Sequence, residues 1–309
     1  MRRWVIALTL LFSIASGGLA ISEAQAFRPA DDAVAGANPH IRTAQQLPRR
    51  VISLIPAVTE MIFAMGEGAR LVGVSNYDRH PPDVERIDRV GGLLDPNVER
   101  ILALRPDLVI VYNTQFELKQ RLDRAGIAYY SYEHRGLPDI TATLRAVGAT
   151  LGSSAAANRV ASQMESDLAA IHQAVAGRPR PKTMLVFGRD PGSLRNIDAS
   201  GGYGFLHDML EVAGGDDVFA DVKQQSVRAT TEMILARRPE AIIELRYGDS
   251  THSADSRRDL AAWDPLSSVP AVRNHRVHVL IGDEFVVPGP RVVGATRQLA
   301  RTLHPGVVR

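Results

Sequence analysis

Residues 97–110 read NVERILALRPDLVI, and residues 230–243 read TTEMILARRPEAII. Both stretches place an acid third, isoleucine fifth, leucine and alanine sixth and seventh, and arginine and proline ninth and tenth. Each copy predicts a short helix with a polar N-cap (Asn97 or Thr230), a proline that prevents its continuation, and then a buried strand. Two such units 133 residues apart predict two similar α/β lobes, because solenoid repeats recur at shorter periods.

The composition narrows the class of protein. A length of 309 residues favours two domains, and 45% hydrophobic residues suffice for real cores. The formal net charge of +2 gives little support for nucleic-acid binding through bulk charge, so we expect no nucleic-acid partner. The chain has no cysteine, which excludes disulfides, thiolate metal sites and a lipid anchor on an N-terminal cysteine.

The N-terminus predicts export. Arg2 and Arg3 precede an apolar run at 5–15, and Ala24-Gln25-Ala26 places small residues where a signal peptidase cleaves. The apolar run is shorter than the roughly 20 residues that span a bilayer, so a membrane anchor is the weaker interpretation. We therefore expect a signal peptide over 1–26, a flexible leader over 27–48, and a periplasmic protein without a lipid anchor.

Residues 49–136 predict the first lobe. Buried-strand patterns occur at 51–55, 71–74, 108–112 and 127–132, with helical patterns between them. Thr114 is placed to cap a helix that ends at Gly126, a residue type that readily takes the left-handed C-cap conformation. Strands that alternate with helices over short connections predict a parallel sheet.

Residues 137–180 are predicted to form a helical region, since from about 154 to 176 the chain has neither a strand pattern nor a helix breaker. Apolar residues at 160, 164, 168, 171 and 175 define one face of a single helix over about 154–176. At 1.5 Å per residue this helix is about 34 Å long. It is either a surface helix of one lobe or, since it lies between the two repeats, a strut that joins the lobes.

Residues 181–309 predict the second lobe with the same alternation. Strands are expected at 183–187 and 277–281, helices at 205–213 and 291–303, and loops at 188–200 and 246–258. The second copy of the repeat falls between them.

A series of short motifs in this chain resembles the iron-chelate and vitamin B12 class of periplasmic substrate-binding proteins. The match covers essentially all of 50–304, and its specificity comes from the order of the motifs rather than from any one of them. These motifs are Val51-Ile52-Ser53-Leu54-Ile55-Pro56 with Thr59-Glu60, Gly73-Val74 before Tyr77 and Pro81-Pro82, Val90-Gly91-Gly92, 99–109, Leu210-Glu211-Val212-Ala213-Gly214-Gly215, 232–243 and Pro288 to Arg291.

The resemblance implies an α/β fold with two Rossmann-like lobes, parallel sheets, one long rigid connecting helix and a ligand cleft between the lobes. It further implies a non-enzymatic receptor that delivers a metal chelate, a ferric siderophore or cobalamin, to the permease dimer of an ABC importer. A haem receptor of the same fold stays open, as does a secreted enzyme that uses the same cleft. We expect a monomer with no cofactor of its own.

Candidate ligand contacts follow from the rule that open α/β sheets bind ligands beyond the carboxyl ends of their strands. Three arginines, Arg189, Arg195 and Arg246, lie in such loops and could converge on an anionic ligand through forked hydrogen bonds. The complete set of nominated residues is Ala57, Tyr77, Leu94, Tyr112, Arg189, Arg195, Arg246, Asp283, Phe285 and Arg291.

Glu99 and Glu232 occupy the same position of the two repeats and have two interpretations. An acid in the first turn of a helix complements the helix dipole, which contributes about 0.3–1 kcal/mol. In the resembling family an acid here contacts arginines of the permease, and its recurrence in both copies favours this docking role.

The remaining motifs restrict the ligand only in part. The nine histidines form no metal-binding spacing, so we expect no metal site made of protein side chains. Corrinoid-binding relatives carry cleft tryptophans, whereas beyond residue 26 this chain has Trp263 alone. Haem-binding relatives have a Gly-Tyr pair just before the repeated unit, whereas this chain has Gly92-Leu93 and so lacks that tyrosine. Hydroxamate-siderophore receptors have an arginine near Leu93, and this arginine is also absent here. The three arginines place a ferric siderophore slightly ahead of a corrinoid.

Overall fold

The computed structural model describes residues 47–247 and 259–307, and the expected signal peptide and most of the leader lie outside this range. The first lobe contains a four-stranded sheet in the order β2-β1-β3-β4, and all its pairings are parallel. Its strands are β1 (Val51–Ser53), β2 (Leu71–Val74), β3 (Leu108–Tyr112) and β4 (Ala128–Tyr132). Its helices are α1 (Pro56–Ala64), α2 (Val98–Ala103) and α3 (Phe116–Ala125), with short 3₁₀ turns η1 (Gly68–Arg70) and η2 (Pro82–Arg86).

The second lobe contains a sheet in the order β10-β9-β5-β6-β8, and β7 also pairs with β5. Its strands are β5 (Lys182–Gly188), β6 (Ile197–Ser200), β7 (Asp216–Asp217), β8 (Ser226–Ala229), β9 (Ala241–Arg246) and β10 (Val277–Ile281). Its helical segments are α6 (Phe205–Val212), α7 (Thr231–Arg237), η4 (Ala261–Leu266), α9 (Pro270–Arg273), η5 (Asp283–Phe285) and α10 (Val292–Leu303).

The second sheet is mixed, which corrects the expectation of a purely parallel sheet. Strand β6 runs antiparallel to both β5 and β8. It occupies the end of the stretch 188–200 that the sequence predicted to be a loop throughout. The connection from β5 to β6 is a short hairpin loop over 189–196 in which the Asp190 N–H donates to the Arg195 carbonyl at 3.0 Å. A loop this short can join only antiparallel strands, because a parallel crossover needs a dozen or more residues.

The internal repeat is confirmed in structural detail. The side chains of Asn97 and Thr230 accept hydrogen bonds from backbone amides in the first turns of α2 and α7. Arg105 and Arg238 both adopt left-handed backbone angles, with φ of 46° and 51°, just before the proline. The next acid then binds the start of the neighbouring strand: Asp107 accepts from the amides of residues 49 and 50, and Glu240 accepts from that of residue 182.

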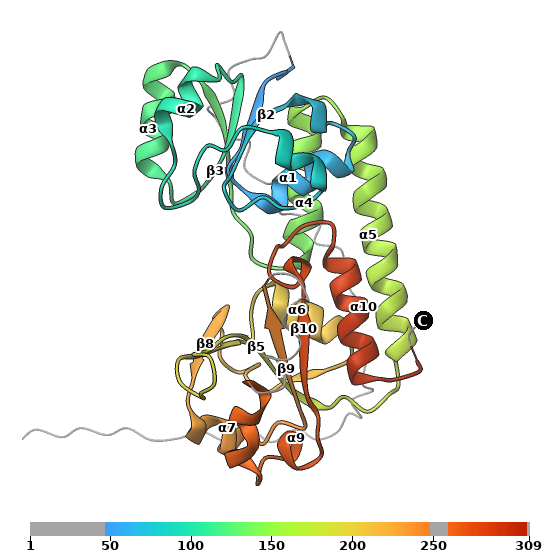
Figure 1. Cartoon of the computed structure of the whole chain (residues 1–309). Helices are drawn as coiled ribbons and strands as arrows, with labels where there is room; N and C mark the ends of the chain where they lie inside the picture. Colours follow the sequence, from blue (N-terminus) through green and yellow to red (C-terminus); the bar gives the residue numbers. More distant parts are fainter. Residues whose placement is uncertain (1–46, 248–258, 308–309) are drawn as a thin grey trace, which may run out of the picture. The chain divides into compact units, whose positions relative to one another are not determined.

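One helix contacts both lobes. Helix α5 (Ser154–Val175) is continuous over 22 residues, in agreement with the predicted 154–176, and corresponds to about 33 Å. It packs against α4 (Leu137–Thr150), which follows the first sheet, and against α6 and α10 of the second lobe (Figure 1). Its buried residues belong to one hydrophobic cluster with residues of both lobes. The α/β architecture with a connecting helix is therefore confirmed.

The start of α3 differs from the prediction. The N-cap residue is Gln115 rather than Thr114, and its side chain makes no capping bond. Gly126 ends the helix in the left-handed conformation, with φ of 67°, as predicted. Within the described residues, no helix is both long enough and apolar enough to cross a membrane.

Candidate functional site

The carboxyl ends of the four parallel strands of the first lobe share one edge, and several nominated residues lie there. Tyr112 is the last residue of β3, and Tyr77 follows β2 with 59% of its surface exposed. Leu94 is 93% exposed, whereas Ala57 is buried in the first turn of α1. Asp78 stabilises the loop that carries Tyr77, because it accepts the Ser75 amide at 2.8 Å and the Ser75 hydroxyl at 2.6 Å.

Gln115, which the sequence did not single out, organises this edge. Its buried side-chain oxygen accepts the Tyr112 amide at 3.0 Å, and its amide nitrogen donates to the carbonyls of Gly92 and Leu93 at 3.3 and 3.0 Å. The loop that precedes α2 is thereby tied to the end of β3. The next residue, Phe116, is 67% exposed, and the Lys119 ammonium group lies 4.9 Å from the centre of its ring.

A run of aromatic rings leads from this edge to the second lobe. The ring of Tyr112 meets that of Tyr132 edge-on, with 5.9 Å between the ring centres, and Tyr132 stacks on His134 with 5.6 Å between the centres. His134 in turn meets Phe205, the first residue of α6, at 5.8 Å. Burial lowers the pKa of His134 and thereby favours its neutral imidazole. The tyrosines of β4 are visible in the sequence, but the contact of the nearby His134 with Phe205, 71 positions later, is not.

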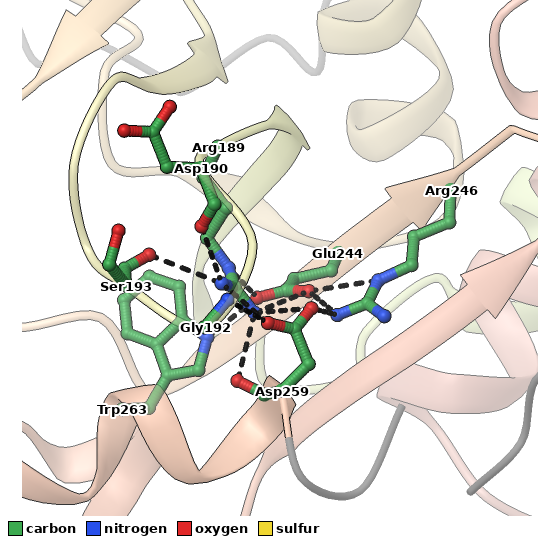
Figure 2. Close-up of polar contacts among 8 residues, drawn as sticks. All are labelled: Arg189, Asp190, Gly192, Ser193, Glu244, Arg246, Asp259 and Trp263. Carbon is green, nitrogen blue, oxygen red and sulfur yellow. Dashed lines mark hydrogen bonds and ion pairs between the residues drawn. The ribbon is translucent and has the colours of Figure 1, made fainter. Parts of the chain in front are cut away.

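Two of the three nominated arginines do converge, but on carboxylates of the protein itself (Figure 2). Arg189 donates from Nε to Glu244 Oε1 at 2.7 Å and from Nη1 to Asp259 Oδ1 at 3.0 Å. Its side chain is only 4% exposed. Burial lowers the pKa of Arg189, but the hydrogen bonds and charges of Glu244 and Asp259 outweigh this effect and raise it.

Arg246 and Trp263 complete this buried network. Arg246 is the last residue of β9 and donates to both Glu244 and Asp259, while its side chain stays 26% exposed. Trp263 is 1% exposed, and its indole nitrogen donates to Glu244 Oε1 at 2.7 Å. Charged groups this deep need partners of opposite charge, because desolvation of an unpaired cation is expensive. Arg195 lies apart from the network: it is 82% exposed and 3.7 Å from Asp190.

The nominated segment 283–291 joins the two lobes. Arg291 binds Glu60 of α1 through two hydrogen bonds of 2.6 and 3.0 Å and contacts Glu284 at 3.1 Å. Burial raises the pKa of Glu60, and Arg291 partly offsets the increase. Asp283 begins the 3₁₀ turn η5, and Phe285 is fully buried in the apolar core.

Two further hydrogen bonds link the lobes at the same edges. Arg79, in the loop after β2, donates to the Tyr247 hydroxyl at 3.2 Å, just beyond β9. Asp208 of α6 accepts the Leu137 amide at the start of α4 at 2.8 Å. The carboxyl edge of the first sheet is therefore bordered by Tyr77, Tyr112 and the exposed Phe116. That of the second sheet is bordered by Arg246 and Tyr247.

Glu99 and Glu232 are exposed residues in the first turns of α2 and α7. The pKa of Glu232 is lowered by its own backbone amide and by Thr230. Beside Glu99 is a surface pocket of about 370 Å³. Its lining residues are Leu94, Asp95, Pro96, Asn97, Val98, Glu99, Glu117, Leu118 and Arg121. Over 47–247 and 259–307, no group of three or more histidine, aspartate or glutamate side chains is arranged to hold a metal ion.

Comparisons with known proteins agree with this architecture. The model of the periplasmic binding protein family matches residues 51–283. The vitamin B12-binding protein of Salmonella typhimurium is 31% identical over 257 residues, which cover 82% of this chain and 90% of that protein. The fold is similar to the vitamin B12-binding protein BtuF of Vibrio cholerae, with a TM-score of 0.69, 24% identity and coverage of 83% and 96% of the two chains. A haem-binding protein of Pseudomonas aeruginosa has a TM-score of 0.71 at 24% identity, with coverage of 84% and 94%.

The family model covers most of the described chain, and the repeated α/β lobes and the connecting helix agree with it. The chain belongs to the periplasmic binding protein family.

Proposed function

We propose that this protein is the receptor of an ABC importer and binds a corrinoid between the carboxyl edges of its two sheets. The observation that carries the proposal is the set of aromatic side chains at these edges. Tyr77 and Phe116 are exposed in the first lobe and Tyr247 is exposed in the second, and Tyr112 begins the ring series that leads to Phe205 of the second lobe.

The arginines support a corrinoid better than an anionic ferric siderophore, which reverses the order favoured by the sequence. Arg189 and Arg246 are neutralised by Glu244 and Asp259, so their charges are largely compensated before any ligand arrives. A corrinoid has a large, flat macrocycle, and aromatic side chains bind such surfaces through area and stacking. The 31% identity with a vitamin B12-binding protein supports the same order.

Docking on the permease completes the proposed cycle. Glu99 and Glu232 project from repeat-related helices and are suited to basic side chains on the importer, whose two membrane subunits would each receive one lobe. The same proposal includes export through a signal peptide cut after Ala26 and a mature protein without a lipid anchor. It also includes a monomeric state and no enzymatic turnover.

Titration of the purified mature protein with cyanocobalamin, haemin and several ferric siderophores tests the ligand. We expect micromolar or tighter binding of cyanocobalamin, unchanged ligand after release, and quenching of Trp263 fluorescence. Trp263 is a suitable reporter because Glu244 links its indole to the partly exposed Arg246.

A matched pair of variants locates the site. Tyr77→Ala removes an exposed ring at the edge and should weaken binding about tenfold, the effect of losing roughly 1.4 kcal/mol of contact. Leu47→Ala removes an exposed side chain that lies against Gly152 and should leave affinity unchanged. Binding of a ferric siderophore without any response to cyanocobalamin would reverse the ligand order, and reproducible chemical conversion of the ligand would contradict a receptor.

A further inference from the structure

Helices α2 and α7 expose the same side chains at equivalent positions. Their inward sides are held by Ile101 and Ile234, both with 0% exposure. On the outward sides, Leu102 is 38% exposed and Leu235 is 40% exposed. Each leucine follows the exposed glutamate of its helix by three residues, and an exposed alanine follows each leucine. An outward leucine therefore recurs at the same place in both lobes.

The two copies have diverged at neighbouring positions. Val98 corresponds to threonine in the second copy, Arg100 to methionine and Leu104 to arginine. Isoleucine and proline are retained at positions that are buried in both copies, because these side chains pack in the core. The exposed leucine and alanine are also retained, although neither fills the interior. A single exposed leucine needs no explanation, but retention of the pair beside divergent neighbours does.

The retained side chains share one surface on each helix. Residues at i, i+3 and i+4 lie on one side of an α-helix, so Glu99, Leu102 and Ala103 form one surface. Glu232, Leu235 and Ala236 form the equivalent surface on α7. Each surface presents a carboxylate beside an apolar area, because the small alanine side chain does not cover the neighbouring leucine. Its complement is a basic side chain next to an apolar depression.

We propose that Leu102 with Ala103 and Leu235 with Ala236 form the apolar half of two equivalent contacts with the membrane subunits of the importer. The inference rests on the proposed docking role of Glu99 and Glu232 and adds the apolar contact to it. A chain that carries one patch twice fits a partner that offers one surface twice, as two identical subunits related by a two-fold axis do. Close apolar packing then excludes water from the ion pair, which strengthens it.

Site-specific crosslinking tests the partner. The full-length receptor is expressed in its own cells with the photoreactive residue p-benzoylphenylalanine at position 102 or 235. Crosslinks from both positions should reach the membrane subunit of an ABC importer and should map to the same segment of that subunit. Position 158, Asn158 in the wild type and exposed on α5, is the control. Crosslinks to two unrelated segments, or equally frequent crosslinks from position 158, overturn the proposal.

Binding measurements with the importer identified in this way test the contribution of the leucines. Leu102→Ser and Leu235→Ser should each weaken the receptor–importer complex about tenfold. Thermal stability and cyanocobalamin affinity should stay unchanged, and Leu47→Ser serves as a control at another exposed leucine.

Comparison with Glu99→Arg and Glu232→Arg separates the two levels of the proposal. If the arginine variants lose the complex while the serine variants bind like the wild type, the apolar contact is refuted and carboxylate docking stands. If all four variants bind like the wild type, docking through α2 and α7 fails as well.

Discussion

Arg189 and Arg195 lie six residues apart in the loop between β5 and β6, yet their side chains are 4% and 82% exposed. The sequence shows the same residue type in the same loop and cannot separate them. The difference arises from Glu244 and Asp259, which approach Arg189 from 55 and 70 residues away. Only one of the two arginines is therefore expected to contribute to stability.

Alanine substitutions make this contrast measurable. Arg189→Ala leaves Glu244 with less compensation inside the lobe and should lower the free energy of unfolding by about 3–5 kcal/mol. Arg195→Ala removes only an exposed ion pair and should change it by less than about 0.5 kcal/mol. Urea denaturation followed by far-UV circular dichroism gives both values. Equal losses of unfolding free energy in the two variants would show that the buried network does not stabilise the fold more than the exposed ion pair does.

Among the helices, two glycines occupy opposite environments. Gly148 lies near the end of α4, where an added Cβ would come within 2.2 Å of the Ala157 Cβ on α5. Gly294 lies in α10 with nothing within 4 Å of the same position. The close contact of α4 with the connecting helix thus depends on a missing side chain, whereas α10 has no such requirement.

Substitution of each glycine by alanine should therefore have opposite signs. Gly294→Ala gains helix propensity and should raise the free energy of unfolding by up to about 1 kcal/mol. Gly148→Ala gains the same propensity but forces the two helices apart, and overpacking of this kind costs about 1–3 kcal/mol. Urea midpoints of the two variants, compared with the wild type, decide the matter. A stabilised Gly148→Ala variant would mean that the helices can separate without cost.

At the scale of the whole molecule, the bidentate pair of Arg291 and Glu60 joins the second lobe to α1 of the first. Glu60 is 5% exposed, and burial raises its pKa above the ordinary value of 4.5 while Arg291 opposes the increase. The other charged or titratable groups that act on this pair are Asp283, Glu284 and His80. The contact between lobes is thus a titratable one.

Removal of the arginine should make stability more dependent on pH. In Arg291→Met, Glu60 loses its partner, so its folded pKa rises further above its unfolded value. A carboxylate with a raised pKa destabilises the fold once it must ionise, so the loss relative to wild type should be small near pH 4 and grow toward neutral pH. The double variant Glu60→Gln/Arg291→Met should recover most of the loss. A loss that is equal at both pH values, or no recovery in the double variant, would contradict this account.

The sequence alone determined the repeated helix–proline–strand units, the first parallel sheet, the limits of the long helix and the exposed acids at 99 and 232. These features depend on local periodicity, capping residues and chain breakers, which act within a few positions. The role of Gln115, the fate of the three arginines, antiparallel β6 and the ring contact of His134 with Phe205 were decided only by the tertiary structure. Each depends on a partner brought from elsewhere in the chain, and in a single sequence no local pattern records which charge or ring that partner will be.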